Sequence, residues 1–196
     1  MEKIYIVTPC YRQQNLEAIR KSIDFSVIHK WYIVYDTSRG RQYIKIFRDP
    51  QIIELECSDF GIAGHPQRNF AIDIIEDGFI YFVDDDNIVH PDCWPLFRTL
   101  DRRCYYTWDQ LRNPAGDDTD WALFTNEQGR VLKGNVLKLQ RIDTAQIIFP
   151  KCLIGDLRWA PDNYKADGVF IESLNAKEPA AHVYIPQIMC YYNYIT

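Results

Sequence analysis

The sequence contains the segment Ile80-Tyr81-Phe82-Val83-Asp84-Asp85-Asp86-Asn87, an apolar run that ends in three carboxylates. A continuous apolar run of this length predicts a short strand buried on both faces. Three adjacent carboxylates repel one another, and this repulsion costs stability unless a cation neutralises it. Oxygen ligands suit Mg²⁺ or Mn²⁺, which commonly take one or two protein carboxylates together with substrate phosphates. The segment therefore predicts a metal site, although a solvated acidic turn is the plain alternative.

Upstream of this segment, apolar runs alternate with stretches in which apolar residues recur at steps of three and four, the spacing of amphipathic helices. The predicted strands cover residues 4–7, 31–35 and 52–55, and the predicted helices cover residues 15–27 and 67–76. This order indicates an α/β fold whose sheet is parallel in its first part. In such sheets ligands bind at the carboxyl ends of the strands. Because Thr8-Pro9, Asp36 and Asp84 each follow a predicted strand, we expect them at one edge.

The character of the chain changes after Pro91. Predicted strands at residues 105–108 and 121–124 are separated by an acidic loop, and this half is expected to be antiparallel and irregular.

Composition restricts the possible classes of protein. The chain has 196 residues, of which 47% are hydrophobic and 25% charged, as in soluble globular domains. The net charge is −5 and no run of five basic residues occurs, which argues against nucleic acid as a partner. No apolar stretch is long enough for a transmembrane helix, and the N-terminus lacks a signal peptide. We therefore expect a cytoplasmic protein with six reduced cysteines, with peripheral contact to a membrane as an open option.

Several segments resemble those of GT-A glycosyltransferases, whose DXD motif at a strand end binds a divalent metal with the donor diphosphate. The segment Ile6-Val7-Thr8-Pro9-Cys10-Tyr11 looks like the family's first strand and nucleotide loop, and Val34-Tyr35-Asp36 looks like its second strand. The segment Pro66-Gln67-Arg68-Asn69, followed by a helix and Tyr81-Phe82-Val83-Asp84-Asp85-Asp86-Asn87, is similar to the animal β-1,3-glucuronyltransferases. Inverting family-2 enzymes are a looser match. The resemblance covers residues 3–97 well and the rest weakly.

This resemblance implies a fold: α/β, a single GT-A (Rossmann-like) domain over residues 1–196, with a mixed, mostly parallel central sheet flanked by helices. Residues 1–97 would form the nucleotide-binding half and residues 98–196 the acceptor-side half.

The resemblance also implies a role for each matching donor-side residue. Asp86 would be the principal metal ligand, supported by Asp84, and Asp85 would contact the ribose or the metal. Asp84 would also orient basic groups nearby. Arg68 would reach the nucleotide or its phosphates, because a guanidinium fork suits phosphate oxygens; an ion pair on the helix surface is its alternative. The remaining donor-binding candidates are Thr8 and Pro9 in the first loop, Asp36 near the base, and Tyr11, which would stack on the base or pack beneath the loop.

A second cluster begins at Tyr164-Lys165-Ala166-Asp167-Gly168. In inverting GT-A enzymes a carboxylate at the start of such a helix deprotonates the acceptor hydroxyl, and Asp167 matches that position. The base must lie within hydrogen-bond reach of the acceptor. The alternative is that Asp167 only caps the helix. Glu172 should face elsewhere, because five residues are not a whole number of helical turns.

Three further residues complete the predicted site. Asp143 and Gln146 match a segment that lies under the donor sugar in the glucuronyltransferases, although Gln146 replaces a small residue there. His182 corresponds to the late histidine that many GT-A enzymes place on the metal or diphosphate. Helix capping by Asp143 and a structural role for His182 are the alternatives.

Together these features predict a metal-dependent glycosyltransferase with Mn²⁺ or Mg²⁺ as cofactor. It would move a sugar from a nucleotide-diphosphate donor, with a UDP-sugar favoured, to a hydroxyl of a glycan or glycolipid acceptor in polysaccharide biosynthesis. Inversion is favoured because Asp167 supplies a base. Three alternatives stay open: a sugar nucleotidyltransferase, a catalytically silent nucleotide-sugar or glycan-binding GT-A domain, and a metal-dependent hydrolase. The nucleotidyltransferase would need a Gly-rich first loop, which Thr8-Pro9-Cys10-Tyr11 is not.

Overall fold

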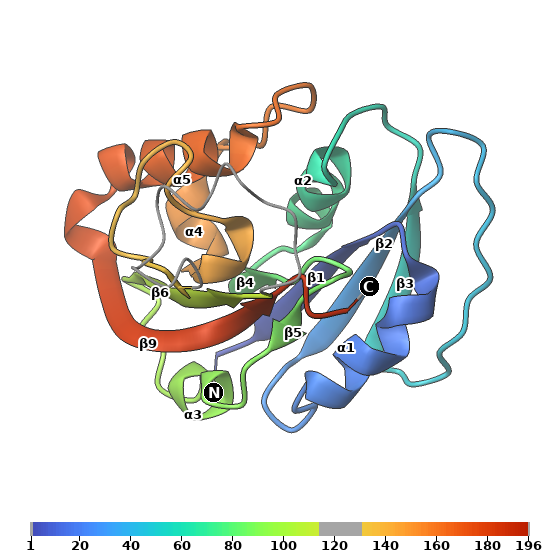
Figure 1. Cartoon of the computed structure of the whole chain (residues 1–196), viewed down its shortest axis with the longest axis horizontal. Helices are drawn as coiled ribbons and strands as arrows, with labels where there is room; N and C mark the ends of the chain where they lie inside the picture. The colour runs from blue at the N-terminus through green and yellow to red at the C-terminus, as the bar shows by residue number, and fades with distance from the viewer. Residues whose placement is uncertain (1, 114–130, 196) are drawn as a thin grey trace.

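The computed structural model describes residues 2–113 and 131–195, which form an α/β structure around one twisted sheet (Figure 1). Half of the sheet is parallel, with strand order β3-β2-β1-β4. These strands are β1 (Ile4–Cys10), β2 (Lys30–Asp36), β3 (Ile52–Cys57) and β4 (Phe79–Phe82). All four predicted strands of the first part are confirmed.

The other half continues from β4 in the order β8-β6-β9-β5, with β7 also paired to β6. These strands are β5 (Ile88–Val89), β6 (Tyr105–Arg112), β7 (Val131–Leu132), β8 (Ile147–Pro150) and β9 (His182–Tyr192). Most pairs in this half are antiparallel, as predicted, but β6 and β9 are parallel. The mixed sheet of the predicted fold class is therefore confirmed. The strand predicted at residues 121–124 and the acidic loop before it lie outside the described residues.

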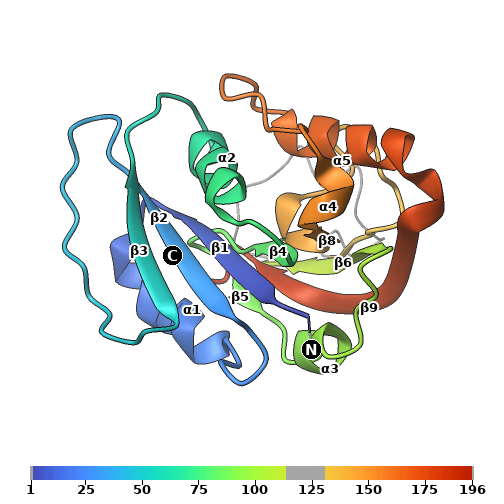
Figure 2. The ribbon, with the colours of Figure 1, turned by 180° about the vertical axis from the view of Figure 1, so that it is seen from behind.

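Helices cover both faces of the sheet, as the two opposite views show (Figures 1 and 2). One face carries α1 (Leu16–Ser22) and α3 (Cys93–Phe97). The other carries α2 (His65–Ile74), α4 (Lys151–Ile154) and α5 (Ala166–Lys177). Three short 3₁₀ turns, η1 (Gln13–Asn15), η3 (Thr144–Gln146) and η4 (Pro179–Ala181), complete the described elements.

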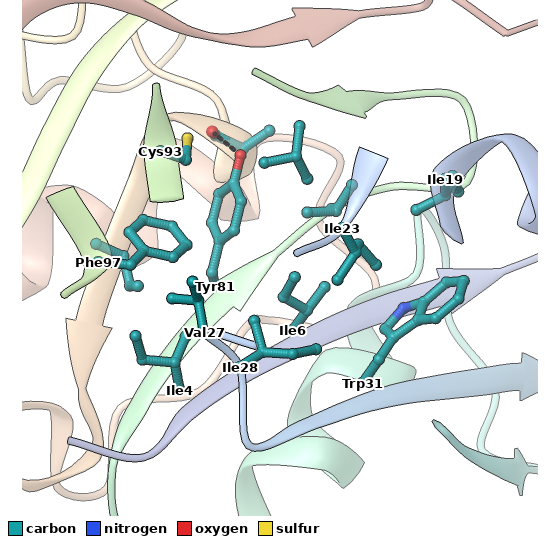
Figure 3. Close-up of a cluster of buried hydrophobic side chains, with 14 of the residues drawn as sticks. Ile4, Ile6, Ile19, Ile23, Val27, Ile28, Trp31, Tyr81, Cys93 and Phe97 are labelled. Atoms are coloured by element: carbon teal, nitrogen blue, oxygen red, sulfur yellow. Dashed lines mark hydrogen bonds between the residues drawn. The ribbon is translucent and has the colours of Figure 1, made fainter. Parts of the chain in front are cut away.

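Two hydrophobic cores result from the alternation of side chains along the buried strands. Along β1, Ile4 and Ile6 enter the core on the α1 side, which Figure 3 shows with Ile19 of α1. Tyr5 and Val7 enter the core beneath α2 and α5. Because β1 is buried on both faces, its position is fixed and its polar carboxyl end is held at the sheet edge.

The helix predicted at residues 15–27 is shorter than expected. It ends at Ser22, because Ile23 has extended backbone angles (φ −92°, ψ 127°). Ile23 and Val27 are nevertheless buried in the core, so burial of the apolar residues was predicted correctly while their conformation was not.

All six cysteines are free, and four of them are buried. Among the helices of residues 2–113 and 131–195, none has the length and apolar character needed to cross a membrane.

Candidate functional site

A cavity of about 390 Å³ opens at the carboxyl ends of β1, β2 and β4. These strands are parallel, so their carboxyl ends meet at the same edge of the sheet. Six predicted site residues line this cavity: Pro9, Tyr11, Asp36, Asp84, Asp85 and Asp86. The structure thus brings the polar strand ends together as the sequence pattern predicted.

Asp85 fastens the loop after β4 to the loop after β1. Its Oδ2 accepts hydrogen bonds from the backbone N–H groups of Tyr11 and Arg12 at 2.5 and 2.6 Å. Its Oδ1 accepts from Nη1 of Arg12 at 2.6 Å, and Asn15 Nδ2 donates to its carbonyl oxygen at 2.9 Å. Both carboxylate oxygens are therefore engaged within the protein. Asp85 therefore has a structural role in holding the first loop, and because it also lines the cavity, its contact with ribose or metal stays a prediction.

Asp86 faces the cavity and shares the same arginine. Nη1 of Arg12 donates to Asp86 Oδ2 at 2.7 Å. Burial raises the pKa of the Asp86 carboxyl, and Arg12 opposes that shift. Arg12 remains 46% exposed at the cavity wall, so it partly neutralises the acidic cluster while staying accessible to an anionic ligand.

Asp84 forms an ion pair with the buried side chain of Arg68. Nη2 of Arg68 donates to Asp84 Oδ1 at 2.5 Å, and the Arg68 side chain is only 2% exposed. Burial, together with the neighbouring carboxylates Asp143, Asp86 and Asp167, raises the pKa of Asp84 despite the arginine. Arg68 does not line the cavity. The predicted contact of Arg68 with the nucleotide is therefore wrong for this structure, since the helix turns its side chain beneath Asp84.

Asp167 lies in the first turn of α5, close to this buried arginine. Its Oδ1 accepts a hydrogen bond from Trp159 Nε1 at 2.9 Å and lies 4.0 Å from Nη1 of Arg68. The side chain of Asp167 is 24% exposed, and no described residue donates to its Oδ2. Helix capping is not its role, because the N-cap of α5 is Lys165 and that cap has no side-chain hydrogen bond. Asp167 does not line the cavity itself, but Tyr164, three residues earlier, does.

Asp143 and Gln146 are engaged inside the protein. They form a capping box around η3, in which Asp143 Oδ1 accepts from Ala145 N and Gln146 Oε1 accepts from Asp143 N. Gln146 Nε2 also donates to the carbonyls of Trp108 and Leu132, and Gln146 is fully buried. The predicted contact of Gln146 with the sugar is therefore wrong, and the capping alternative holds for Asp143, which is 8% exposed.

His182 lies far from the aspartates. The register aligns Tyr81 with Ile148, Tyr106 and Val183 on successive strands, so His182 begins β9 at the level of the middle of β4. Three strand spacings of about 4.8 Å separate β4 from β9, and Asp86 lies beyond the carboxyl end of β4. His182 instead bonds through Nε2 to Thr107 Oγ1 at 2.7 Å. The register therefore argues against the predicted role of His182 as a metal ligand beside Asp86.

The remaining predicted donor residues differ in accessibility. Thr8 is fully buried and its Oγ1 accepts from Trp31 Nε1 at 2.9 Å, so the predicted donor contact of its side chain is wrong. Tyr11 is 41% exposed, and Arg41 covers one face of its ring at 3.6 Å from the centroid. Asp36 faces the cavity while one carboxylate oxygen accepts two hydrogen bonds from Ser38.

The donor set for a cation consists of Asp84 and Asp86. Both line the cavity, and each uses one carboxylate oxygen in an ion pair. Residues 2–113 and 131–195 contain no group of three or more His, Cys, Asp or Glu side chains arranged around one point. Two carboxylates completed by substrate phosphates and water nevertheless suit Mg²⁺. The residues therefore fit a cation that arrives with a diphosphate rather than a site fully built by the protein.

Sequence reasoning missed several residues of the cavity. Arg12, Arg39 and Gln67 bring polar side chains to it, and Tyr164 and Tyr192 bring aromatic ones. The loop before α2 also lines it, with Gly64 at φ 74°, where an added Cβ would lie 2.6 Å from Pro9. The exposed, isolated Arg12 follows no periodic pattern, so only the proximity of its loop to the aspartates identifies it.

The mixed α/β sheet is that of the GT-A fold, and comparison with solved structures supports this assignment of the fold. No family model matches the chain, and no curated protein matches its sequence. *S. aureus* TarS 1–349 superposes with a TM-score of 0.69 over 97% of this chain, at 13% identity and over 60% of that structure. The complex of TarS 1–349 with UDP gives a TM-score of 0.68 at 12% identity, over 96% of this chain and 60% of that structure. The complex with UDP-GlcNAc gives a TM-score of 0.63 at 14% identity, over 96% of this chain and 58% of that structure.

A second match is glucosyl-3-phosphoglycerate synthase from *Mycobacterium tuberculosis* in complex with phosphoglyceric acid. Its TM-score is 0.60 at 15% identity, over 97% of this chain and 72% of that one. At these identities the matches show the fold alone, and this chain spans about 60% of the length of TarS 1–349. The predicted GT-A resemblance is confirmed for the fold. The likeness to the β-1,3-glucuronyltransferases stays a prediction.

Proposed function

We propose that this protein is a glycosyltransferase that binds a nucleoside-diphosphate sugar in the cavity at the carboxyl edge of β1, β2 and β4. The observation that carries the proposal is the lining of this cavity, in which Asp36, Arg12, Asp84 and Asp86 converge in a fold shared with structures that hold UDP and UDP-GlcNAc. Asp36 would receive the nucleoside, and Arg12 would bind the diphosphate, because guanidinium groups form strong charge-assisted bonds to phosphate oxygens.

Asp84 and Asp86 would hold Mg²⁺ or Mn²⁺ together with the donor phosphates. A bound cation of this kind stabilises the negative charge that develops on a departing diphosphate. Arg12 would share this task, because its guanidinium already lies within 2.7 Å of the acidic cluster.

Asp167 is proposed as the general base. The acceptor hydroxyl oxygen would bond to the anomeric carbon as the bond from that carbon to the diphosphate breaks. The hydroxyl proton would pass to Asp167, and the nucleoside diphosphate would leave with the electron pair. Direct displacement of this kind inverts the anomeric centre. Trp159 orients the carboxylate through Oδ1, and Oδ2 accepts no hydrogen bond from a described residue. A glycan or glycolipid hydroxyl is the proposed acceptor, and the cytoplasm the proposed compartment.

A thermal-shift panel of UDP, GDP, CMP and dTDP, each with and without Mn²⁺, tests the donor site. A ligand that binds only the native state raises Tm, and the rise grows with the logarithm of the ligand's excess over Kd. We expect one diphosphate to raise Tm, the shift to require Mn²⁺, and Asp86→Ala to abolish it. A folded protein that shifts with none of the four nucleotides would exclude the proposed donor site.

Replacing Arg12 separates diphosphate binding from simple neutralisation of the acidic cluster. We expect Arg12→Ala to weaken binding of the preferred nucleoside diphosphate by about 10- to 100-fold, the range for hydrogen bonds to charged groups. Calorimetric titration with the diphosphate and with the free nucleoside measures this, and the nucleoside should be much less affected. Arg20→Ala on α1 is the control, because among the described residues Arg20 forms an ion pair only with Glu17, at 3.5 Å. If Arg12→Ala instead tightens Mn²⁺ binding and leaves diphosphate affinity unchanged, Arg12 serves only to neutralise the acidic cluster.

A further inference from the structure

The loop between β2 and β3 runs back along β3, the edge strand of the sheet, at one end of the molecule (Figures 1 and 2). Its residues 39–48, which we call the basic loop, carry Arg39, Arg41, Lys45 and Arg48 and contain no acidic residue. This is a local positive charge in a chain of net charge −5. The positive charge of this loop does not form an uninterrupted basic run in the sequence, because other residues separate the four basic side chains.

The basic loop is anchored to the sheet by its inward side chains. Tyr43 stacks on Tyr35 with ring centroids 4.5 Å apart, and Phe47 packs on Trp31 at 5.6 Å. The carboxylate of Glu54 on β3, itself only 6% exposed, accepts hydrogen bonds from the backbone N–H groups of Ile46 and Phe47 at 3.0–3.1 Å. The conformation of the loop is therefore specified by the fold.

The same anchoring turns two isoleucines into solvent. Ile44 is 78% exposed and Ile46 is 47% exposed. The four basic side chains are exposed as well, and none forms an ion pair with a carboxylate of residues 2–113 or 131–195. Protection of the sheet edge explains why a loop covers β3 and why Tyr43 and Phe47 point inward. It does not explain why two isoleucines point outward among positive charges without ion-pair partners, because exposed isoleucines cost solubility without stabilising the fold.

We propose that the basic loop docks the protein on an anionic lipid bilayer. Ile44 and Ile46 would enter the boundary between headgroups and acyl chains, and Arg39, Arg41, Lys45 and Arg48 would contact lipid phosphates. A bilayer is favoured over a soluble polyanion because the isoleucines need an apolar phase. Stable attachment generally takes two signals, and the loop combines an apolar insertion with a basic cluster.

Docking would place the cavity next to the membrane. Arg39 belongs to both the basic loop and the cavity wall, and Arg41 covers the ring of Tyr11, another lining residue. A membrane-borne acceptor could then approach the cavity without leaving the bilayer. The docking surface does not rest on the proposed enzymatic activity, and it is tested without an acceptor.

Co-sedimentation with vesicles of phosphatidylcholine, alone or mixed with phosphatidylglycerol, tests the proposal on the full chain. We expect binding to the mixed vesicles only, weakened by salt. Lys45→Glu/Arg48→Glu should reduce the partition coefficient by about 25-fold or more, since each basic residue near an anionic surface contributes about fivefold. Ile44→Ser/Ile46→Ser should reduce it by about tenfold, through the lost apolar contact.

The matched control is Lys138→Glu/Val169→Ser, which changes an exposed lysine and an exposed apolar residue near α5, at the other end of the molecule. This control should bind like the wild type. An unchanged partition of both loop variants, with Tm preserved, would overturn the proposal. Binding of soluble polyphosphate as tightly as vesicles, with no effect of Ile44→Ser/Ile46→Ser, would also overturn it. A loop that only joins two copies of the chain, as measured by sedimentation velocity, would overturn it as well. A nucleotide-induced rise in Tm in the loop variants would show that nucleotide binding at the donor site does not depend on membrane binding by the basic loop.

Discussion

Asp167→Asn should lower the rate of sugar transfer by about 10²- to 10⁴-fold, the contribution expected of a positioned general base. The substitution removes the basic oxygen and the negative charge 4.0 Å from Arg68, while Arg68 keeps its ion pair with Asp84 at 2.5 Å. An asparagine Oδ1 can still accept the hydrogen bond that Trp159 Nε1 donates at 2.9 Å, so the position of the side chain is retained. The measurement is release of nucleoside diphosphate from the donor, with an acceptor preparation that supports turnover by the wild type.

Two controls identify the cause of such a loss. Glu172 lies on the same helix and is exposed, and from residues 2–113 and 131–195 its carboxylate accepts only a long bond of 3.4 Å from Leu139 N. Glu172→Gln should therefore keep wild-type activity. Thermal shift with the donor diphosphate should be the same for Asp167→Asn and the wild type, because Asp167 does not line the cavity. If Asp167→Asn leaves every activity unchanged, the silent nucleotide-sugar-binding domain becomes the better account of this chain.

The central part of the site was predictable from sequence because it depends on strand ends. A continuous apolar strand fixes where its last residue lies, and parallel strands bring their carboxyl ends to one edge. Asp36, Asp84 and Asp86 therefore reach the same cavity without any knowledge of loop shape.

Residue type and order do not suffice to predict the role of a site residue where that role depends on the direction of its side chain. Thr8 and Pro9 are adjacent, yet Thr8 is buried against Trp31 while Pro9 lines the cavity. Arg68 was expected among the phosphates because arginine suits them, but the geometry of α2 places its side chain below Asp84. One residue along a strand, or a fraction of a turn along a helix, changes the face of the element.

The register and the pairing partners of the strands likewise could not be predicted from the sequence. His182 was assigned to the metal because it occurs late in the chain, but its height in the sheet follows from the pairing of β9 with β6. The family resemblance implies a sugar contact for Gln146, and its three hydrogen bonds inside the protein become visible only when β6 and β7 are in place. Such long-range contacts leave no local pattern.

Arg68→Met should lower the free energy of unfolding by about 3–5 kcal/mol, the usual effect of removing one member of a buried ion pair. Methionine fills much of the arginine volume, so the loss reports the charge. Without the guanidinium, Asp84 and Asp167 would lose the cation that lies 2.5 and 4.0 Å from their carboxylates. Denaturation by urea with linear extrapolation measures the change. Arg158→Met is the matched control, because the exposed pair with Asp73 at 2.6 Å should contribute at most about 1 kcal/mol.

The double variant Arg68→Met/Asp84→Asn tests the cause directly. If an unpaired Asp84 carboxylate produces the loss, removing its charge should recover much of the stability, and the two substitutions will not be additive. This outcome distinguishes the buried arginine from the phosphate-binding arginine that the family resemblance implied. A donor-binding Arg68 would give the opposite pattern: the stability of Arg68→Met would stay within about 0.5 kcal/mol of the wild type, as for ordinary surface substitutions, while nucleotide binding disappeared. Because Arg68 is 2% exposed and lies beneath Asp84, loss of stability should come first, and any loss of nucleotide affinity should follow from the displaced Asp84.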